Sequence, residues 1–456
     1  MIRRAHLTLG RPGPLQLAAL ALLIAAAIVA LLSPGQPDGA ALSTFDPQAR
    51  LRTAAEQRPP TTTADLVAQL QQRIRRVPED VQAQALLGQA YVQRARETGD
   101  PSYYAKAEAV LHAAQRRDPA HVETLIGLGA LALARHDFAA ALALGEQARA
   151  LNPDIARIYG VIGDAQIELG RYDDAVQTIQ HMVDLRPDLS SYSRVSYLRE
   201  LHGDTAGAIE AMQAAVTAGG PNAENTQWAR VQLGNLAFSQ GDLATAERHY
   251  QRALALLPDD TPATAALARV RAAQGRYDEA IALYTAATQR MPLPEYVIAL
   301  GDIYARTGDT AQAARQYELV QAMDALLAAN GVNTDLETAL FFADHDLDLP
   351  ASLTKARAAY AARPSVHAAD VLAWTLYKTG SYAEAQRYSA EALRLGAQDS
   401  LKLFHAGMIA HAAGQPEQAR DDLRRALMLN PHFSLRYEGL AAATLKELDA
   451  RLEGDS

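Results

Sequence analysis

Apolar residues recur along this chain at three- and four-residue steps, and glycine and proline interrupt them at regular intervals. In the clearest stretch, residues 159–187, one apolar run ends at Gly170, a second begins at Tyr172, and Pro187 closes it. This spacing predicts two amphipathic helices joined by a tight turn. Because two short helices cannot bury their apolar faces alone, copies of the pair must stack on one another.

The same pattern returns with a period of about 34 residues. Eight clear units begin near residues 122, 156, 189, 227, 261, 294, 366 and 400, and the gap between 294 and 366 has room for two. Upstream, residues 82–119 form a unit with a lengthened loop at 98–103, and residues 64–78 predict a lone second helix. We therefore expect about ten helix-turn-helix units between residues 64 and 433.

Two segments depart from the repeated pattern. The unit at residues 327–365 has no turn glycine, and residues 344–350 (Asp-His-Asp-Leu-Asp-Leu-Pro) stand in its place. We expect the curvature of the stack to change there. Residues 434–456 contain an amphipathic run from Leu435 to Leu452, which predicts the solvent-facing capping helix that such an array requires.

The period and the recurring residue types resemble the tetratricopeptide repeat (TPR) family over about residues 64–433. Leu-Gly pairs at 128–129, 233–234 and 300–301 match the paired site of the family's first helix. Turn positions hold Gly170, Gly203, Gly241, Gly275, Gly308, Gly380 and Gly414. Close-contact positions of the second helix hold Ala141, Ala175, Ala208, Ala246, Ala280, Ala313, Ala385 and Ala419. The resemblance implies an all-α, right-handed superhelical solenoid.

In that family the first helix of every unit lines a concave face, whose variable positions hold a peptide or helix of a partner. The resemblance therefore implies a partner-binding groove formed by Arg157, Asp164, Glu168, Tyr197, Glu200, Trp228, Asn235, Phe238, Arg269, Asp302, Arg306, His367, Trp374, Tyr377, Lys378, Phe404, Met408 and His411. Near its carboxyl end, Trp374, Tyr377, Lys378, Phe404 and His411 form one aromatic patch on this interpretation. Packing between neighbouring helices is the alternative. Asn235 and Arg269 only partly match the family's carboxylate clamp, which uses Lys and Asn.

The amino-terminal segment predicts a membrane anchor. Residues 15–32 (LQLAALALLIAAAIVALL) contain Gln16 as their only polar residue, and a helix of that length spans about 27 Å of hydrocarbon. Three arginines in residues 1–14 predict a cytoplasmic amino terminus, which places the solenoid outside the cytoplasm, in the periplasm or the extracellular space. Residues 33–63, rich in proline and polar residues, predict a flexible linker. Cleavage of a signal peptide followed by secretion is the alternative.

The composition of the chain argues against several classes of function. The chain has 43 basic and 52 acidic residues, a formal net charge of −9 that argues against nucleic-acid binding. Because there is no cysteine, disulfides, thiolate zinc sites and thiol nucleophiles are excluded.

Two short motifs resemble a catalytic signature and a calcium-binding loop, but each lacks a required part. Ser352-Leu-Thr-Lys355 and Lys378-Thr-Gly380 match penicillin-binding signatures, but the intervening Ser-Asp-Asn is missing. Asp344, Asp346 and Asp348 resemble the start of a calcium loop that lacks its required glycine and closing glutamate. We expect no catalytic residue, metal, cofactor or small-molecule substrate.

The sequence therefore predicts a membrane-anchored scaffold for protein partners, within a bacterial envelope assembly. The alternative is an assembly chaperone that binds client polypeptides during the maturation of secreted proteins, cytochromes or surface polymers.

Overall fold

The computed structural model describes residues 62–219 and 223–454, which lie in one compact unit of the chain, Pro60–Ser456. These residues form 22 helices and no strand, as the sequence predicted. The predicted anchor at residues 15–32, its basic flank and nearly all of the predicted linker lie outside the described residues. Of the helices in the described ranges, none has both the length and the apolarity needed to cross a membrane.

Twenty of these helices form ten consecutive pairs, each with a first and a second helix. The first five pairs are α4 (Val81–Thr98) with α5 (Ser102–Arg117), α6 (Val122–Ala134) with α7 (Phe138–Leu151), α8 (Ala156–Glu168) with α9 (Tyr172–Leu185), α10 (Leu189–Leu201) with α11 (Thr205–Thr217), and α12 (Ala223–Ser239) with α13 (Leu243–Leu256). The other five are α14 (Thr261–Ala273) with α15 (Tyr277–Arg290), α16 (Pro294–Thr307) with α17 (Thr310–Ala329), α18 (Asp335–Asp344) with α19 (Leu349–Ala362), α20 (Val366–Lys378) with α21 (Tyr382–Ala392), and α22 (Ser400–Ala412) with α23 (Pro416–Leu429). Helix α3 (Thr63–Arg76) precedes the pairs, and α24 (Glu438–Gly454) follows them.

Small residues allow the paired helices to approach closely. Ala175 on α9 is fully buried, and a Cβ atom added to Gly234 on α12 would lie 2.3 Å from Tyr250 Cε1 on α13. The turn between paired helices requires a left-handed residue, which glycine adopts without strain. Where glycine is missing, His136 (φ 60°) makes the turn before α7 and Asp346 (φ 54°) the turn before α19.

The stacking of consecutive helices is interrupted once among the described residues, between α17 and α18. Any other two successive helices approach each other closely along their lengths, whereas α17 and α18 make little or no close approach. Instead, Phe341 of α18 inserts its ring among Val297 of α16 and Val320 of α17. The predicted irregular unit therefore divides the array into a first stack, α3–α17, and a second stack, α18–α24.

The second stack lies against the first along a line of contacts that we call the seam. It joins the helix-pair turns of α6–α13 to the loops that precede α18, α20, α22 and α24. His136 Nδ1 lies 2.8 Å from the carbonyl oxygen of Asn333, 197 residues away. The amide of Val366 donates to Tyr172 Oη (2.8 Å), 194 residues away, and Asn430 Nδ2 donates to the Phe238 carbonyl (2.9 Å) across 192 residues.

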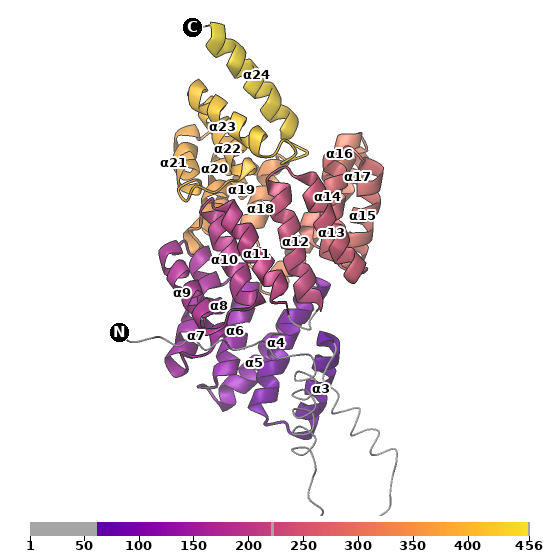
Figure 1. The fold of residues 1–456 in the computed structure, drawn as a ribbon, viewed down its shortest axis with the longest axis vertical. Coiled ribbons are helices and arrows are strands. Elements are labelled where there is room, and N and C mark those ends of the chain that lie inside the picture. Colours follow the sequence, from indigo (N-terminus) through magenta and orange to yellow (C-terminus); the bar gives the residue numbers. More distant parts are fainter. Residues whose placement is uncertain (1–61, 220–222, 455–456) are drawn as a thin grey trace, which may run out of the picture. The chain divides into compact units, whose positions relative to one another are not determined.

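This nearly constant separation means that one turn of the superhelix takes 192–197 residues, so that each turn contacts the next. Figure 1 shows the result: the orange helices α19–α21 lie beside the magenta helices α8–α10. Side chains from distant units thus face one another across the seam.

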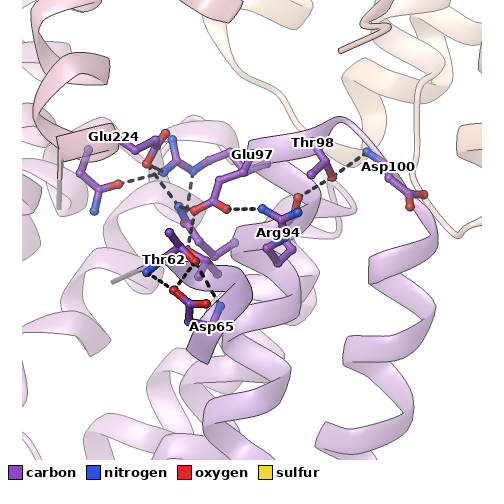
Figure 2. Close-up of polar contacts among 11 residues, drawn as sticks. Thr62, Asp65, Arg94, Glu97, Thr98, Asp100 and Glu224 are labelled. Carbon is purple, nitrogen blue, oxygen red and sulfur yellow. Dashed lines mark hydrogen bonds and ion pairs between the residues drawn. The ribbon is translucent and has the colours of Figure 1, made fainter. Parts of the chain in front are cut away.

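A second contact between distant units lies at the beginning of the array (Figure 2). Glu97, at the end of α4, accepts hydrogen bonds from Thr63 Oγ1 (2.6 Å) and Arg94 Nη1 (2.9 Å). One residue earlier, Arg96 Nη2 lies 2.7 Å from Glu224 Oε2 at the start of α12. This network connects the first and fifth helix pairs.

Candidate functional site

The first helices of consecutive units present polar side chains to one another at the repeat spacing. Arg157 of α8 donates to Glu123 Oε1 of α6 (2.5 Å) and to Gln89 Oε1 of α4 (3.2 Å). Gln89 in turn donates to Glu123 Oε2 (3.0 Å). The Arg157 side chain remains 49% exposed, so its guanidinium is accessible on this face.

A similar arrangement recurs three units later. Arg269 Nη2 of α14 donates to Asn235 Oδ1 of α12 (2.8 Å), and its guanidinium lies 4.1 Å from the ring centroid of Phe238. Tyr250 Oη also donates to Asn235 Oδ1 (2.8 Å). Arg269 is exposed, whereas Phe238 is buried beneath it. The structure thus brings three of the predicted groove residues into one cluster.

Asp302 and Arg306 of α16 are instead engaged by the carboxyl-terminal end of the array. Asp302 Oδ1 lies 2.9 Å from His345 Nε2 and accepts hydrogen bonds from Arg436 Nη1 (3.1 Å) and Tyr317 Oη (2.8 Å). Arg306 lies 3.6 Å from Glu438. These contacts tie α16 to the segment that leads into α24.

Two cavities open along the seam, and seven of the predicted groove residues line them. The first cavity, of about 340 Å³, is lined by Leu133, His136, Phe138, Asp164, Ile167, Glu168, Tyr197, Glu337 and Arg363. The second, of about 240 Å³, is lined chiefly by Tyr197, Glu200, Leu201, Phe238, Arg269, His367, Asp399, Ser400, Lys402 and Phe433. Tyr197 of α10 borders both, so the cavities are adjacent.

Burial shapes the electrostatics between the cavities. Tyr197 Oη lies 3.0 Å from His367 Nε2 across the seam. Burial raises the pKa of the Tyr197 phenol and lowers that of the His367 imidazole to about 4, so both groups are neutral at pH 7.

The carboxylates near Tyr197 and His367 differ in how far nearby cations offset the effect of burial on their pKa. Burial raises the pKa of Glu168 and of Glu200, and neighbouring carboxylates raise both further, while Arg363 lowers the first and Lys402 the second without reversing the shift. Asp399 behaves oppositely: despite burial, the nearby Lys402 ammonium holds its pKa below the usual value.

The predicted aromatic patch is wrong as a surface, because two of its three aromatic side chains of Trp, Tyr and Phe type belong to the core. Trp374 is 1% exposed and Phe404 is 0% exposed. The Trp374 indole donates to Asp344 Oδ1 (2.8 Å) and stacks on His405, with ring centroids 4.2 Å apart. Packing between helices, the alternative interpretation, describes this cluster.

Other predicted groove residues near the patch are also engaged within the fold. Tyr377 stacks on Trp374 with ring centroids 4.8 Å apart, and Lys378 forms an ion pair with Asp346. Met408 is buried, Trp228 packs against the core from a partly buried position, and His411 is partly exposed.

The residues of the two chemical motifs have structural partners. Ser352 is fully buried and donates to the Ala339 carbonyl (2.8 Å), and Lys355 pairs with Asp335 (2.8 Å). Of the three aspartates that resemble a calcium loop, Asp344 binds Trp374 and Asp348 accepts a hydrogen bond from the Ala351 amide at the start of α19. No group of three metal-ligating side chains converges within the described ranges.

Sequence reasoning missed several residues of these sites. Glu123 and Gln89 stand one and two periods before Arg157, so the 34-residue period was a usable signal for them. Arg363, at the end of α19, and Ser400, at the start of α22, line the cavities from the opposite side of the seam. No local pattern points to them, because the first-helix residues that they face in the cavities lie almost two hundred positions away.

The hydrogen-bonded first-helix residues, Arg157 with Glu123 and Gln89 and Arg269 with Asn235, form what we call the polar ladder. Stacked helix pairs that carry such a ladder define a helical-repeat protein. Family models of the tetratricopeptide repeat match residues 132–200 and 237–303, residues 366–398 and residues 403–433. The chain belongs to the tetratricopeptide repeat family. Proteins of this family act as scaffolds for protein–protein interaction, and this chain is such a scaffold.

Several solved structures are similar to this chain at low sequence identity. A thermophilic TPR protein from Thermus thermophilus is 21% identical over 44% of this chain and 99% of its own, with a TM-score of 0.36. The human IFIT1 dimer with PPP-AAAA is 14% identical over 83% of this chain and 96% of its own, with a TM-score of 0.44. Yeast Tom70 is 11% identical over 89% of this chain and 94% of its own, with a TM-score of 0.35. No curated protein sequence matches the chain.

Proposed function

We propose that this protein is a membrane-anchored scaffold that holds an extended segment of a partner protein along the polar face of its first helices. The observation that carries this proposal is the ladder itself. Arg157 and Arg269 occupy the same face of first helices three units apart, and both are exposed while their neighbours on the ladder hold them in place. Side chains fixed in this way lose little entropy when they bind a peptide.

The membrane part of the proposal rests on the sequence. An apolar run at residues 15–32 behind a basic flank is typical of an uncleaved anchor. An anchor of this kind confines the solenoid to a surface, which raises its effective concentration near partners at the same membrane. We propose the outer face of a bacterial cytoplasmic membrane as that surface, with no catalytic step.

Photocrosslinking tests which face of the helix pairs binds. A photoreactive residue is placed at position 157 or 269 in the full chain in its membrane. The matched control carries it in place of Arg248, an exposed arginine on the second helix α13. We expect positions 157 and 269 to yield one discrete adduct that position 248 does not. Equal adducts from position 248, or none from the first helices, would overturn the proposal.

The composition of the adduct separates the scaffold from the chaperone. One stoichiometric partner supports the scaffold, whereas a wide range of client polypeptides at the same positions would replace it with an assembly chaperone. Alkaline extraction of membranes tests the anchor: the full chain should stay in the pellet, and a chain beginning at residue 33 should not.

A further inference from the structure

The two seam cavities share an unusual feature: each contains one carboxylate without a hydrogen bond from any described residue. In the first cavity this is Glu168 of α8, whose only ion-pair contact within the described ranges is Arg363 Nη1 at 3.8 Å. In the second it is Glu200 of α10, whose carboxylate forms no ion pair with the part of the chain that the structure describes. Tyr197 stands between the two cavities.

The other charges of the first cavity are already matched. Arg194 binds both carboxylate oxygens of Asp164, at 2.8 and 2.7 Å. Arg363 Nη2 donates to Glu337 at 2.9 Å. Glu168 therefore shares Arg363 with Glu337 and has only the longer of the two contacts, at 3.8 Å. Burial raises the pKa of Glu168 most, the Arg363 guanidinium offsets part of that rise, and the nearby Glu337 and Asp164 raise the pKa again, so an added cation would stabilise the charged form.

The second cavity repeats this charge pattern near Glu200. Asp399 is paired with Lys402 Nζ at 2.7 Å. Burial and the Asp399 carboxylate raise the pKa of Glu200, and the Lys402 ammonium, already bound to Asp399, offsets only part of that rise. Arg269 also borders the cavity, but its guanidinium lies over Phe238 and is hydrogen-bonded to Asn235.

A separate observation points to a missing ligand group in the second cavity. Ser400 borders it and is only 6% exposed, yet its hydroxyl has no hydrogen-bond partner among the described residues. Leaving such a group unsatisfied costs about 1–3 kcal/mol, so native structures usually provide a partner. A ligand that donates hydrogen bonds would satisfy the Ser400 oxygen and the Glu200 carboxylate together.

Both cavities also have apolar walls suited to a hydrocarbon chain. Leu133, Phe138 and Ile167 line the first, and Leu201 and Phe433 are among those lining the second. Arg363 already places a basic side chain in these surroundings. Its guanidinium lies 5.4 Å from the Phe138 ring centroid while it donates a hydrogen bond to Glu337. Lysine and arginine bury their methylene stems in such surroundings and present the charge at the end.

We propose that the two cavities each receive one basic side chain, lysine or arginine, from a single extended segment of the partner protein. This inference rests on the proposed function, and it identifies the charge of the partner. The ammonium or guanidinium groups bind Glu168 and Glu200, and Ser400 Oγ accepts a further hydrogen bond. Neighbouring helices pack about 8–10 Å apart and an extended chain rises about 3.3 Å per residue, so the basic residues stand about two or three positions apart.

A fluorescent synthetic peptide tests the proposal against the full chain. The probe is an octapeptide of glycine and serine with two lysines three positions apart, and its matched form carries norleucine, which keeps the stem and removes the charge. Anisotropy should show binding of the lysine probe only. Glu168→Gln and Glu200→Gln should each weaken it about ten-fold or more, the loss expected for a charge-assisted hydrogen bond. Ser400→Ala should weaken it less.

Glu210→Gln is the control, because Glu210 is exposed on the second helix α11. It should leave binding unchanged. Equal binding of the norleucine probe would overturn the proposal, as would wild-type affinity in both glutamine variants. If butylamine competes at the same concentration as the peptide, the ligand of the cavities is a small amine and the proposed peptide is wrong. A partner captured at positions 157 and 269 and unaffected by either variant would sink this inference while leaving the proposed function intact.

Discussion

The seam can be tested by comparing alanine at two turn glycines that differ only in what faces them. Gly170 and Gly275 both adopt a left-handed conformation, with φ of 70° and 74°. A Cβ atom at Gly170 would lie 2.3 Å from the carbonyl oxygen of Pro364 across the seam. At Gly275 it would meet nothing within 4 Å.

The expected cost follows from these two environments. Alanine in a left-handed conformation costs about 1–2 kcal/mol at either position. At Gly170 a backbone atom must also move away, and overpacking of this kind costs about 1–3 kcal/mol more. We therefore expect Gly170→Ala to reduce the free energy of unfolding by about 2–5 kcal/mol and Gly275→Ala by about 1–2 kcal/mol.

Urea denaturation followed by helical circular dichroism gives the free-energy difference, and hydrogen exchange shows where it acts. In Gly170→Ala, faster exchange should appear in residues 363–367, far from the substitution in sequence. Gly203→Ala and Gly414→Ala form a second matched pair, because only Gly203 faces a backbone oxygen, that of Gly396. If the two variants of each pair lose the same free energy of unfolding, the two stacks do not contact each other in solution, and the seam is refuted.

Further substitutions probe the core, the seam and its titration. Trp374→Ala removes a ring that is 1% exposed and should cost about 3–5 kcal/mol in denaturation, whereas a loss below about 1 kcal/mol would return Trp374 to the surface. Tyr172→Phe leaves the buried Val366 amide without an acceptor and should cost about 1–3 kcal/mol; an unchanged unfolding midpoint would contradict the hydrogen bond. Because His367 has a pKa of about 4 against an ordinary 6.5, unfolding takes up a proton between these values, so stability should fall as pH drops from 6.5 to 4. His367→Gln should flatten that part of the pH profile, and a profile identical to wild type would refute it. For Glu200, whose pKa is raised, the sign is opposite: stability is lost as pH rises through its titration, so Glu200→Gln should raise the melting temperature at pH 7, and a lowered one would contradict this.

The sequence was sufficient where the structure is local. Residues 159–187 predicted two helices around Gly170, and α8 and α9 lie there, because each helix pair is stabilised mainly by its own apolar face and its neighbours. The irregular unit was also visible: without a turn glycine, Asp346 adopts the left-handed conformation.

The candidate site was less predictable because it depends on contacts between distant parts of the chain. Trp374 occupies a first-helix position that matches the family's groove, yet Tyr437, from the segment before α24, packs edge-on against it at 5.4 Å. A 34-residue pattern does not reveal which residues a later turn of the solenoid will cover. For the same reason, Glu168 and Glu200 were expected in a groove, but the loops that enclose them were not anticipated.

The seam has a consequence for how this protein can evolve. A repeat array whose copies contact only adjacent copies can gain or lose one by duplication or deletion, since every junction is equivalent. Here His136, Tyr172 and Phe238 each meet a specific residue 192–197 positions later. Deleting one copy between them would bring the wrong loop to every one of these positions at once. Lineages of this protein should therefore conserve the number of copies between residues 136 and 430 more strictly than the identity of any single copy.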